Sequence, residues 1–174
     1  MSEPAPNVCD GYYYYRLVGA SDIGEDPTAN TIPLTAFFTA TLHGGPLENC
    51  VLAPVTSEHD LNEIAVAAGQ ERYTYVGVRK STSALFVEAA GGSTDNWYNL
   101  DGTPVPTSAW KSGRPNNGGG LQAYAAYDSN GAGGLEDLDN YRPKFSNGDT
   151  LTLNKAVMKC CAKGYVAKTF CTAP

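Results

Sequence analysis

The sequence predicts a domain of the α+β class, and three observations lead to this prediction. Two early segments, 33–43 and 57–68, carry apolar residues at the spacing of a helix face. After residue 69 the chain offers short apolar segments typical of strands, separated by long stretches rich in Gly, Pro and Asn. Only 17% of the residues are charged and 42% are hydrophobic, which disfavours disorder. Helices followed by strands are typical of this class, and 174 residues suit one domain.

The first strand is expected over 11–18, where four consecutive tyrosines and Arg-Leu-Val have a strong β preference. Successive side chains of a strand point to opposite faces, so we expect the tyrosines to alternate between core and surface. The pair on the solvent side would then form a contact patch. Residues 19–32 are rich in Gly, Ser, Asp, Pro and Asn and predict a loop.

Both helices have recognisable ends. Pro33 suits the first position of the first helix, and Gly44-Gly45 ends that segment. Ser57 can cap the second helix, with Asp60 three residues on, and Gly69 follows its last apolar residue. The apolar faces consist of Leu34, Phe37, Phe38 and Leu42 in the first helix and of Leu61, Ile64, Ala65 and Ala68 in the second.

Further strands are expected over 73–79, 84–89, 121–127 and 151–160. Tyr124 and Tyr127 fall on opposite faces of their strand, so we expect one of them in the core. The stretches 90–120 and 128–150 predict no regular structure. In a compact domain such long stretches are usually functional or wrongly assigned.

The charges restrict the partners. The chain has 12 Lys and Arg against 18 Asp and Glu, a net charge of −6, and no basic cluster. We therefore expect neither a nucleic acid nor an anionic membrane as a partner. No apolar run reaches the roughly 18 residues of a membrane span, and residues 1–8 lack the sections of a signal peptide.

The chain has five cysteines: Cys9, Cys50, Cys160, Cys161 and Cys171. They lack the C-x2-C spacing of a zinc site, and both histidines lie far from them in sequence. We therefore expect an extracellular, disulfide-bonded protein, with free thiols buried in a cytosolic core as the alternative. The sequence does not choose among the pairings, and the odd number leaves room for a free thiol or an intermolecular bridge.

Catalysis finds little support in the sequence. Residues 57–60, Ser-Glu-His-Asp, include the residue types of a catalytic triad, but consecutive residues at a helix start point in different directions. No G-x-S-x-G motif is present, and Gly118-Gly119-Gly120 lacks the Lys-Ser/Thr of a phosphate-binding loop. We therefore do not expect an enzyme.

Four motifs follow one another along the chain. They are LAPVTSE at 52–58, YVGV at 75–78, NWYNLDGTPV at 96–105 and WKSGRPNN at 110–117. In order and spacing they resemble the C-type lectin-like domain, over roughly residues 33–160. The resemblance implies two helices flanking small antiparallel sheets, and a long loop that presents the ligand. It divides the single domain 1–174 into an N-terminal strand, hairpin and loop (9–32), the core (33–160) and a C-terminal extension (161–174).

Members of that family often hold calcium through a tripeptide, E-P-N or Q-P-D with a cis proline, and through a second motif, W-N-D. The matching segments here are 114–116, Arg-Pro-Asn, and 135–137, Leu-Glu-Asp. The resemblance thus implies calcium as the cofactor, with Asn116, Glu136 and Asp137 as its ligands and with Asn117 and Asp139 as further oxygen donors. Against calcium, the Arg114 side chain has five donors and no acceptor, and its charge opposes the ion. Asp and Asn in Gly-rich loops are also ordinary turn formers.

The cysteines depart from the family's positions. From the resemblance we expect Cys50 to pair with Cys160 or Cys161 at the last strand. Cys9 and Cys171 would then close the termini.

The resemblance implies an extracellular, non-catalytic recognition module that contacts a glycan or a glycoprotein through the long loop 90–150. Arg114 would set specificity by donating to sugar hydroxyls, a carboxylated sugar or a sulfate. An exposed Tyr98, Trp110 or Tyr141 would stack on a sugar ring or anchor a protein. The expected ligand-binding residues are Arg114, Asn116, Asn117, Glu136, Asp137 and Trp110.

The alternative is a structural or protein-binding lectin-like domain that binds neither sugar nor calcium. Oxygens that converge on a common point near Asn116 would favour the first function. An Arg114 ion pair that fills this space would favour the second. Exposed aromatic side chains and the odd cysteine also leave room for self-assembly.

Overall fold

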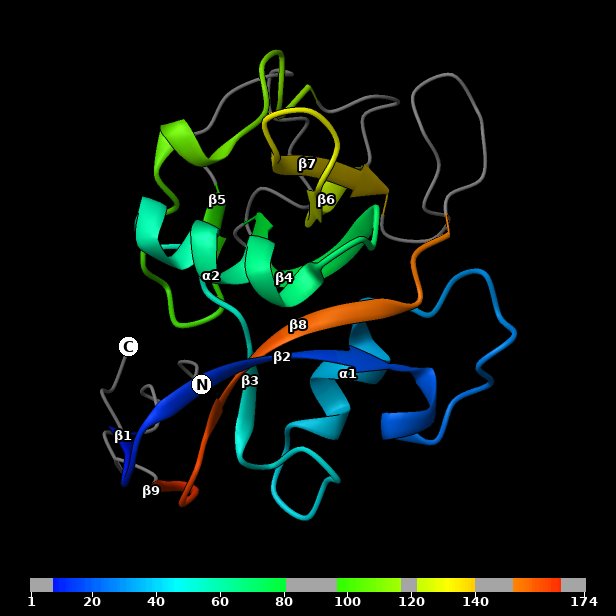
Figure 1. Ribbon diagram of the computed structural model, residues 1–174, viewed down its shortest axis with the longest axis vertical. Coiled ribbons are helices and arrows are strands. Elements are labelled where there is room, and N and C mark those ends of the chain that lie inside the picture. The colour runs from blue at the N-terminus through cyan, green and yellow to red at the C-terminus, as the bar shows by residue number, and fades with distance from the viewer. Residues whose placement is uncertain (1–7, 81–96, 117–121, 140–151, 167–174) are drawn as a thin grey trace.

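The computed structural model describes residues 8–80, 97–116, 122–139 and 152–166 (Figure 1). In chain order its elements are β1 (Val8–Cys9), β2 (Tyr13–Gly19), the 3-10 helix η1 (Ala20–Ile23), α1 (Leu34–Ala40), β3 (Cys50–Leu52), α2 (Glu58–Ala68), β4 (Tyr73–Lys80), β5 (Trp97–Asn99), the 3-10 helix η2 (Thr107–Ala109), β6 (Gln122–Asp128), β7 (Gly134–Asp139), β8 (Lys155–Cys161) and β9 (Tyr165–Val166). The expected strand at 84–89 lies outside the described residues. None of the helices described is long and apolar enough to cross a membrane.

Seven strands form one sheet in the order β2-β8-β4-β6-β7, with β3 on β8 and β5 on β4. Its pairings are antiparallel except for a short parallel contact between β4 and β8. β1 and β9 form a separate two-stranded ladder near the two ends of the described chain. This arrangement of two helices and a mixed sheet confirms the α+β class.

The two faces of the sheet carry different apolar clusters, each covered by one helix. Along β4, Tyr75 faces the cluster that contains α1, and the next residue, Val76, faces the cluster that contains α2. Figure 1 shows α2 beside β4 and α1 beside β2 and β8. The helix α2 also contacts β2 and β8 from its own side, and α1 contacts β3 and η1. Tyr124 and Tyr127 also contact opposite clusters, and Tyr127 is buried, as the alternation predicts.

The helices follow the local signals in the sequence. The N–H of Asp60 donates to the Ser57 hydroxyl at 3.3 Å, which confirms the predicted cap of α2. Ile64 and Ala68 are buried on the apolar face of this helix. The first helix is shorter than predicted, because α1 ends at Ala40 and the following residues turn away.

The prediction of an irregular stretch over 128–150 is wrong at β7, and the short strands β3 and β5 were not predicted. Four of the six β7 residues are Asp, Glu or Gly, which are depleted in strands. The strand forms because Leu135 and Leu138 enter opposite clusters. The carboxylates of Glu136 and Asp137 also find partners in distant segments.

Two disulfides link the end of β8 to β1 and to β3. Cys50 pairs with Cys160, as expected, because β3 lies opposite β8 in that register. The expected pairing of Cys9 with Cys171 is wrong, since Cys9 bonds Cys161. The β1–β9 ladder folds Cys9 back over the end of β8, where Cys161 lies. Cys171 lies outside the described residues.

The four tyrosines 12–15, of which Tyr12 precedes β2, do not alternate between core and surface as predicted. Tyr12, Tyr13 and Tyr14 are exposed by 73%, 46% and 37%, because this end of the strand extends beyond both helices (Figure 1). The ammonium of Lys159 lies 4.4 Å from the centre of the Tyr13 ring, a cation–π distance.

Candidate ligand-binding surface

The segment 110–116 runs along β7 and brings the predicted site residues together. Trp110 forms an isolated bridge with Leu135, and the N–H of Lys111 donates to the Leu135 carbonyl at 3.0 Å. At the other end the N–H of Asn116 donates to both carboxylate oxygens of Asp137, at 3.1 and 3.0 Å. The two predicted motifs, 114–116 and 135–137, therefore face each other. Which of their side chains touch a ligand stays a prediction.

Gly134 permits this close approach. A Cβ atom there would lie 2.8 Å from Cγ of Lys111 and 3.2 Å from the carbonyl oxygen of Ala109, and φ is +144°. A side chain at this position would push the segment 110–116 away from β7.

Three cations and two carboxylates form a cluster beside this segment. The Nε atom of Arg72 lies 2.8 Å from Oδ1 of Asp128, and the Nζ atom of Lys111 lies 2.9 Å from its Oδ2. The Oε1 atom of Glu136 lies 3.9 Å from Nε of Arg114 and 4.0 Å from Nζ of Lys111. The Arg114 ion pair that would favour the function without sugar or calcium is therefore present.

The two carboxylates have opposite pKa shifts. Burial raises the pKa of Asp128, but hydrogen bonds from Arg72, Lys111 and the Asn130 N–H outweigh it and hold that pKa below its ordinary 3.8. Burial, followed by the charge of Asp128, raises the pKa of Glu136 above its ordinary 4.5, and the charges of Arg114 and Lys111 offset only part of this. The surroundings of Asp128 thus favour its ionised form, whereas those of Glu136 disfavour its ionised form.

The bond between Arg114 and Pro115 is cis, the form that the resemblance implies for the tripeptide. Pro115 is buried, whereas the Arg114 side chain is 23% exposed. The motif thus presents a cation at the surface where the family's motif presents a carboxylate or an amide.

The residues present do not fit a calcium ion. Both carboxylate oxygens of Asp137 accept from the backbone of Asn116, and Glu136 faces two cations. Calcium prefers a cage of oxygen donors, and the charge of Arg114 opposes it. In the part of the chain that the structure describes, no three His, Cys, Asp or Glu side chains converge on a point that could hold a metal. Asn117 and the side chain of Asp139 lie outside that part.

Trp110 does not lie on the surface, so the expectation of an exposed ring at this position is wrong. Its side chain is 8% exposed, and its ring centre lies 4.8 Å from that of Trp97 in an edge-to-face pair. Because Ala109 and Leu135 join the same apolar cluster, the indole packs inward beneath the segment that Arg114 occupies. Trp110 therefore supports this surface rather than lining it.

Sequence reasoning missed four residues that shape the surface. Asn99 accepts from the N–H of Val55 at 2.7 Å and donates to the Val55 carbonyl at 3.0 Å, which fixes β5 to the segment before α2. The other three are Arg72, Lys111 and Asp128. Arg72 and Asp128 meet because β4 and β6 pair at their ends, with Tyr73 opposite Asp128. No spacing in the sequence shows this pairing.

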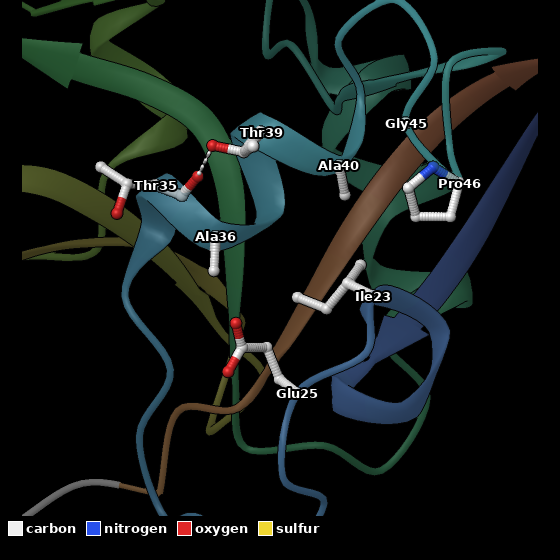
Figure 2. A pocket seen from close by; sticks show the side chains of 8 residues that line it. All are labelled: Ile23, Glu25, Thr35, Ala36, Thr39, Ala40, Gly45 and Pro46. Carbon is white, nitrogen blue, oxygen red and sulfur yellow. Dashed lines mark hydrogen bonds between the residues drawn. The ribbon is translucent and has the colours of Figure 1, made fainter.

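A pocket of about 410 Å³ lies elsewhere, between η1 and α1 (Figure 2). The hydroxyl of Thr39 in its wall already donates to the Thr35 carbonyl at 2.8 Å. The residues that line it are Ile23, Glu25, Thr35, Ala36, Thr39, Ala40, Gly45 and Pro46. None of the predicted site residues lines this pocket.

No protein-family model matches the chain, and no curated protein matches it. Solved structures do match. CEL-I, a C-type lectin from Cucumaria echinata, aligns with a TM-score of 0.51 and 13% identity over 97% of this chain and 100% of that one. The C-type carbohydrate-recognition domain of cow CD23, solved in the presence of GlcNAc2Man3 oligosaccharide, aligns with a TM-score of 0.52 and 17% identity over 90% and 98%. The chain therefore has the C-type lectin-like fold, which confirms the resemblance seen in the four motifs.

Proposed function

We propose that the chain is an extracellular, non-catalytic recognition module that binds a glycan or a glycoprotein without calcium. One domain spans residues 1–174, and its ligand contacts the surface formed by the segment 110–116 and β7. The observation that carries this proposal is the partly exposed Arg114 side chain beside a cis proline, which places a cation at the position of a calcium-binding tripeptide. The ion pair of Arg114 with Glu136 argues against calcium, as the alternative function also requires, but at 3.9 Å and with 23% exposure the guanidinium can still reach a ligand. The fold of CEL-I and of the CD23 domain, both named for carbohydrate recognition or as lectins, supports the ligand class.

The charges favour a ligand with an acidic group, such as a carboxylated or sulfated sugar. The side chains of Arg114 and Arg72 are 23% and 52% exposed, and the charge of Glu136 acts on both. Guanidinium groups donate to carboxylates and sulfates through two parallel hydrogen bonds. Asp128 is fully buried beneath them, so the ligand meets the cations first.

The disulfides support the extracellular location. Cys9–Cys161 and Cys50–Cys160 engage four of the five cysteines, and such bridges persist in oxidising compartments.

The test is a broad glycan array, probed with labelled protein in calcium and again in EDTA. We expect the same acidic glycans to bind in both buffers, because no calcium contributes to the contact. Arg114→Glu should abolish this binding, since it reverses the charge that meets the acidic group. Arg16→Glu is the matched control, because Arg16 lies on β2 and pairs with Asp22. Binding that disappears in EDTA, or acidic binding retained by Arg114→Glu, would contradict the proposal.

A protein-binding domain without sugar recognition is the second candidate. The exposed Tyr12, Tyr13 and Tyr14 favour it, because tyrosine is enriched at protein interfaces. An array without binding in either buffer, together with loss of a partner on Tyr12→Ser and Tyr14→Ser, would replace the first function by this one.

A further inference from the structure

We infer that Lys111 is the internal cation of this surface. Its ammonium group lies in a cradle, that is, a site lined by oxygen atoms, and neutralises their negative charge as a bound metal ion would. The inference concerns how the surface is held in place, so it does not depend on which ligand binds.

The cradle is formed by oxygens from three places in the chain. The Nζ atom of Lys111 lies 2.9 Å from Oδ2 of Asp128 at the end of β6 and 3.2 Å from the carbonyl oxygen of Asn130 in the following turn. It also lies 4.0 Å from Oε1 of Glu136 on β7. An ammonium group has three donors and no acceptor, which suits a site made of oxygens alone. One cation thus connects a strand, a turn and the next strand.

The backbone holds the lysine in this position. The N–H of Lys111 donates to the Leu135 carbonyl at 3.0 Å, and its own carbonyl accepts from the N–H of Arg114 at 2.9 Å. Its stem passes against Gly134, where a Cβ would lie 2.8 Å from Lys111 Cγ. The side chain is 21% exposed. Because the lysine stem already packs against β7, forming the ion pair costs less side-chain entropy. The pair of Lys111 and Asp128 differs in this from a pair of mobile side chains on the surface.

The carboxylate that it neutralises has no contact with solvent. The side chain of Asp128 is 0% exposed, and its remaining donors are Nε of Arg72 at 2.8 Å and the Asn130 N–H at 2.9 Å. Removal of Lys111 would leave the buried charge of Asp128 with Arg72 and the Asn130 N–H, and a buried charge that loses part of its compensation destabilises the folded state. A free divalent ion at this place would meet the charges of Arg72 and Arg114. The three cations therefore oppose a metal ion at this place, where Lys111 supplies a positive charge to the buried Asp128 carboxylate.

The pair formed by Lys155 and Glu71 provides a matched comparison. Its side chains are 34% and 36% exposed, and within the described residues the lysine pairs with one carboxylate. Loss of an exposed pair of this kind changes stability little.

The experiment measures the Tm of the wild-type chain and of Lys111→Met, Lys111→Arg and Lys155→Met, each in millimolar calcium and in EDTA. We expect the wild-type Tm to be equal in both buffers and Lys111→Met to lower it by about 10 °C, the fall typical of breaking a buried pair in a domain of this size. Lys111→Arg should recover most of the loss because it keeps the charge. Lys155→Met should lower Tm by at most about 3 °C. If Lys111→Met does not fold, Lys111→Gln takes its place.

An NMR titration of the Asp128 carboxyl separates the electrostatic role from mere packing. Lys111→Met should raise the pKa of Asp128, and Lys111→Arg should leave it low. The inference is overturned if calcium stabilises the wild type, if Lys111→Met costs no more than Lys155→Met, or if the Asp128 titration is unchanged. These measurements use no ligand, so an empty glycan array would refute the proposed function and leave this result standing.

Discussion

Replacement of Asn99 by alanine should destabilise the fold more than any other single polar truncation on the β5 side of the surface. The Asn99 side chain is 2% exposed and bonds both backbone groups of Val55, at 2.7 and 3.0 Å. It also donates to the Thr103 hydroxyl at 3.1 Å. Alanine at this position removes all three bonds and leaves the N–H and carbonyl of buried Val55 without these partners.

The size of the expected loss in stability follows from the N–H and the carbonyl of Val55, which would lose their partner. A buried donor or acceptor that loses its partner costs about 1–3 kcal/mol, so Asn99→Ala should cost about 4 kcal/mol in the free energy of unfolding. In a domain of this size that is a fall in Tm of about 12 °C. The loss of one exposed side chain costs roughly 0.5 kcal/mol or less. Asn62→Ala, at an exposed position of α2, is therefore the matched control.

Urea unfolding followed by tryptophan fluorescence measures both variants. The chain has two tryptophans, Trp97 and Trp110, and they pack against each other close to Asn99, so the signal reports this region. A loss smaller than about 1 kcal/mol for Asn99→Ala would refute the reasoning, because it would mean that water or a relaxed backbone satisfies Val55.

Three further predictions concern the backbone, the bridges and the pH. Gly134→Ala should lower Tm and weaken ligand binding, because its Cβ would press on Lys111 and Ala109. Gly19→Ala, at the end of β2, should change neither, because φ there is −105° and its Cβ would meet only the Asp22 carboxylate, at 3.9 Å. Replacing Cys50 and Cys160 together by serine should lower the free energy of unfolding by about 4–5 kcal/mol in the chain-entropy model, because the bridge spans 110 residues. Urea unfolding measures this loss, and a loss under about 1 kcal/mol would contradict the prediction. Since the pKa of Glu136 lies above its ordinary 4.5, the folded state binds a proton before the unfolded state as the pH falls. As the pH falls from neutral to 4.5, the wild type should therefore gain free energy of unfolding relative to Glu136→Gln. Urea midpoints of both proteins across this pH range measure the gain, and a difference between them that does not change with pH would exclude the raised pKa.

The parts of the fold that the sequence predicts are those set by neighbouring residues. The cap of α2 needs only Ser57 and Asp60, three positions apart, and its apolar face needs only the period of the helix. The strand at β4 and the opposite faces of Tyr124 and Tyr127 likewise follow from local alternation.

The remaining parts depend on pairing between distant segments. β7 looks like a loop because Glu136 and Asp137 disfavour a strand, and the groups that compensate them come from the segment 110–116. The partner of Cys9 depends on the β1–β9 ladder, which no local signal predicts. The burial of Trp110 follows from its packing on Trp97, which approaches from another strand.

The residues that identify the fold differ in burial from Arg114, the residue that departs from the calcium-binding tripeptide. Within the motifs, Val76, Trp97, Asn99 and Trp110 are buried, and a Cβ on Gly77 would lie 2.5 Å from the Leu52 carbonyl oxygen. A change at these positions would cost packing, so they define the fold. Arg114 is the residue that departs from the tripeptide, and its side chain reaches solvent. Exposed positions can change without loss of the fold, so the departure at Arg114 leaves the architecture that the resemblance predicts intact, while the ligand chemistry stays a prediction. Calcium chemistry must therefore be argued from Lys111, Arg114 and their carboxylates, and these argue against the ion.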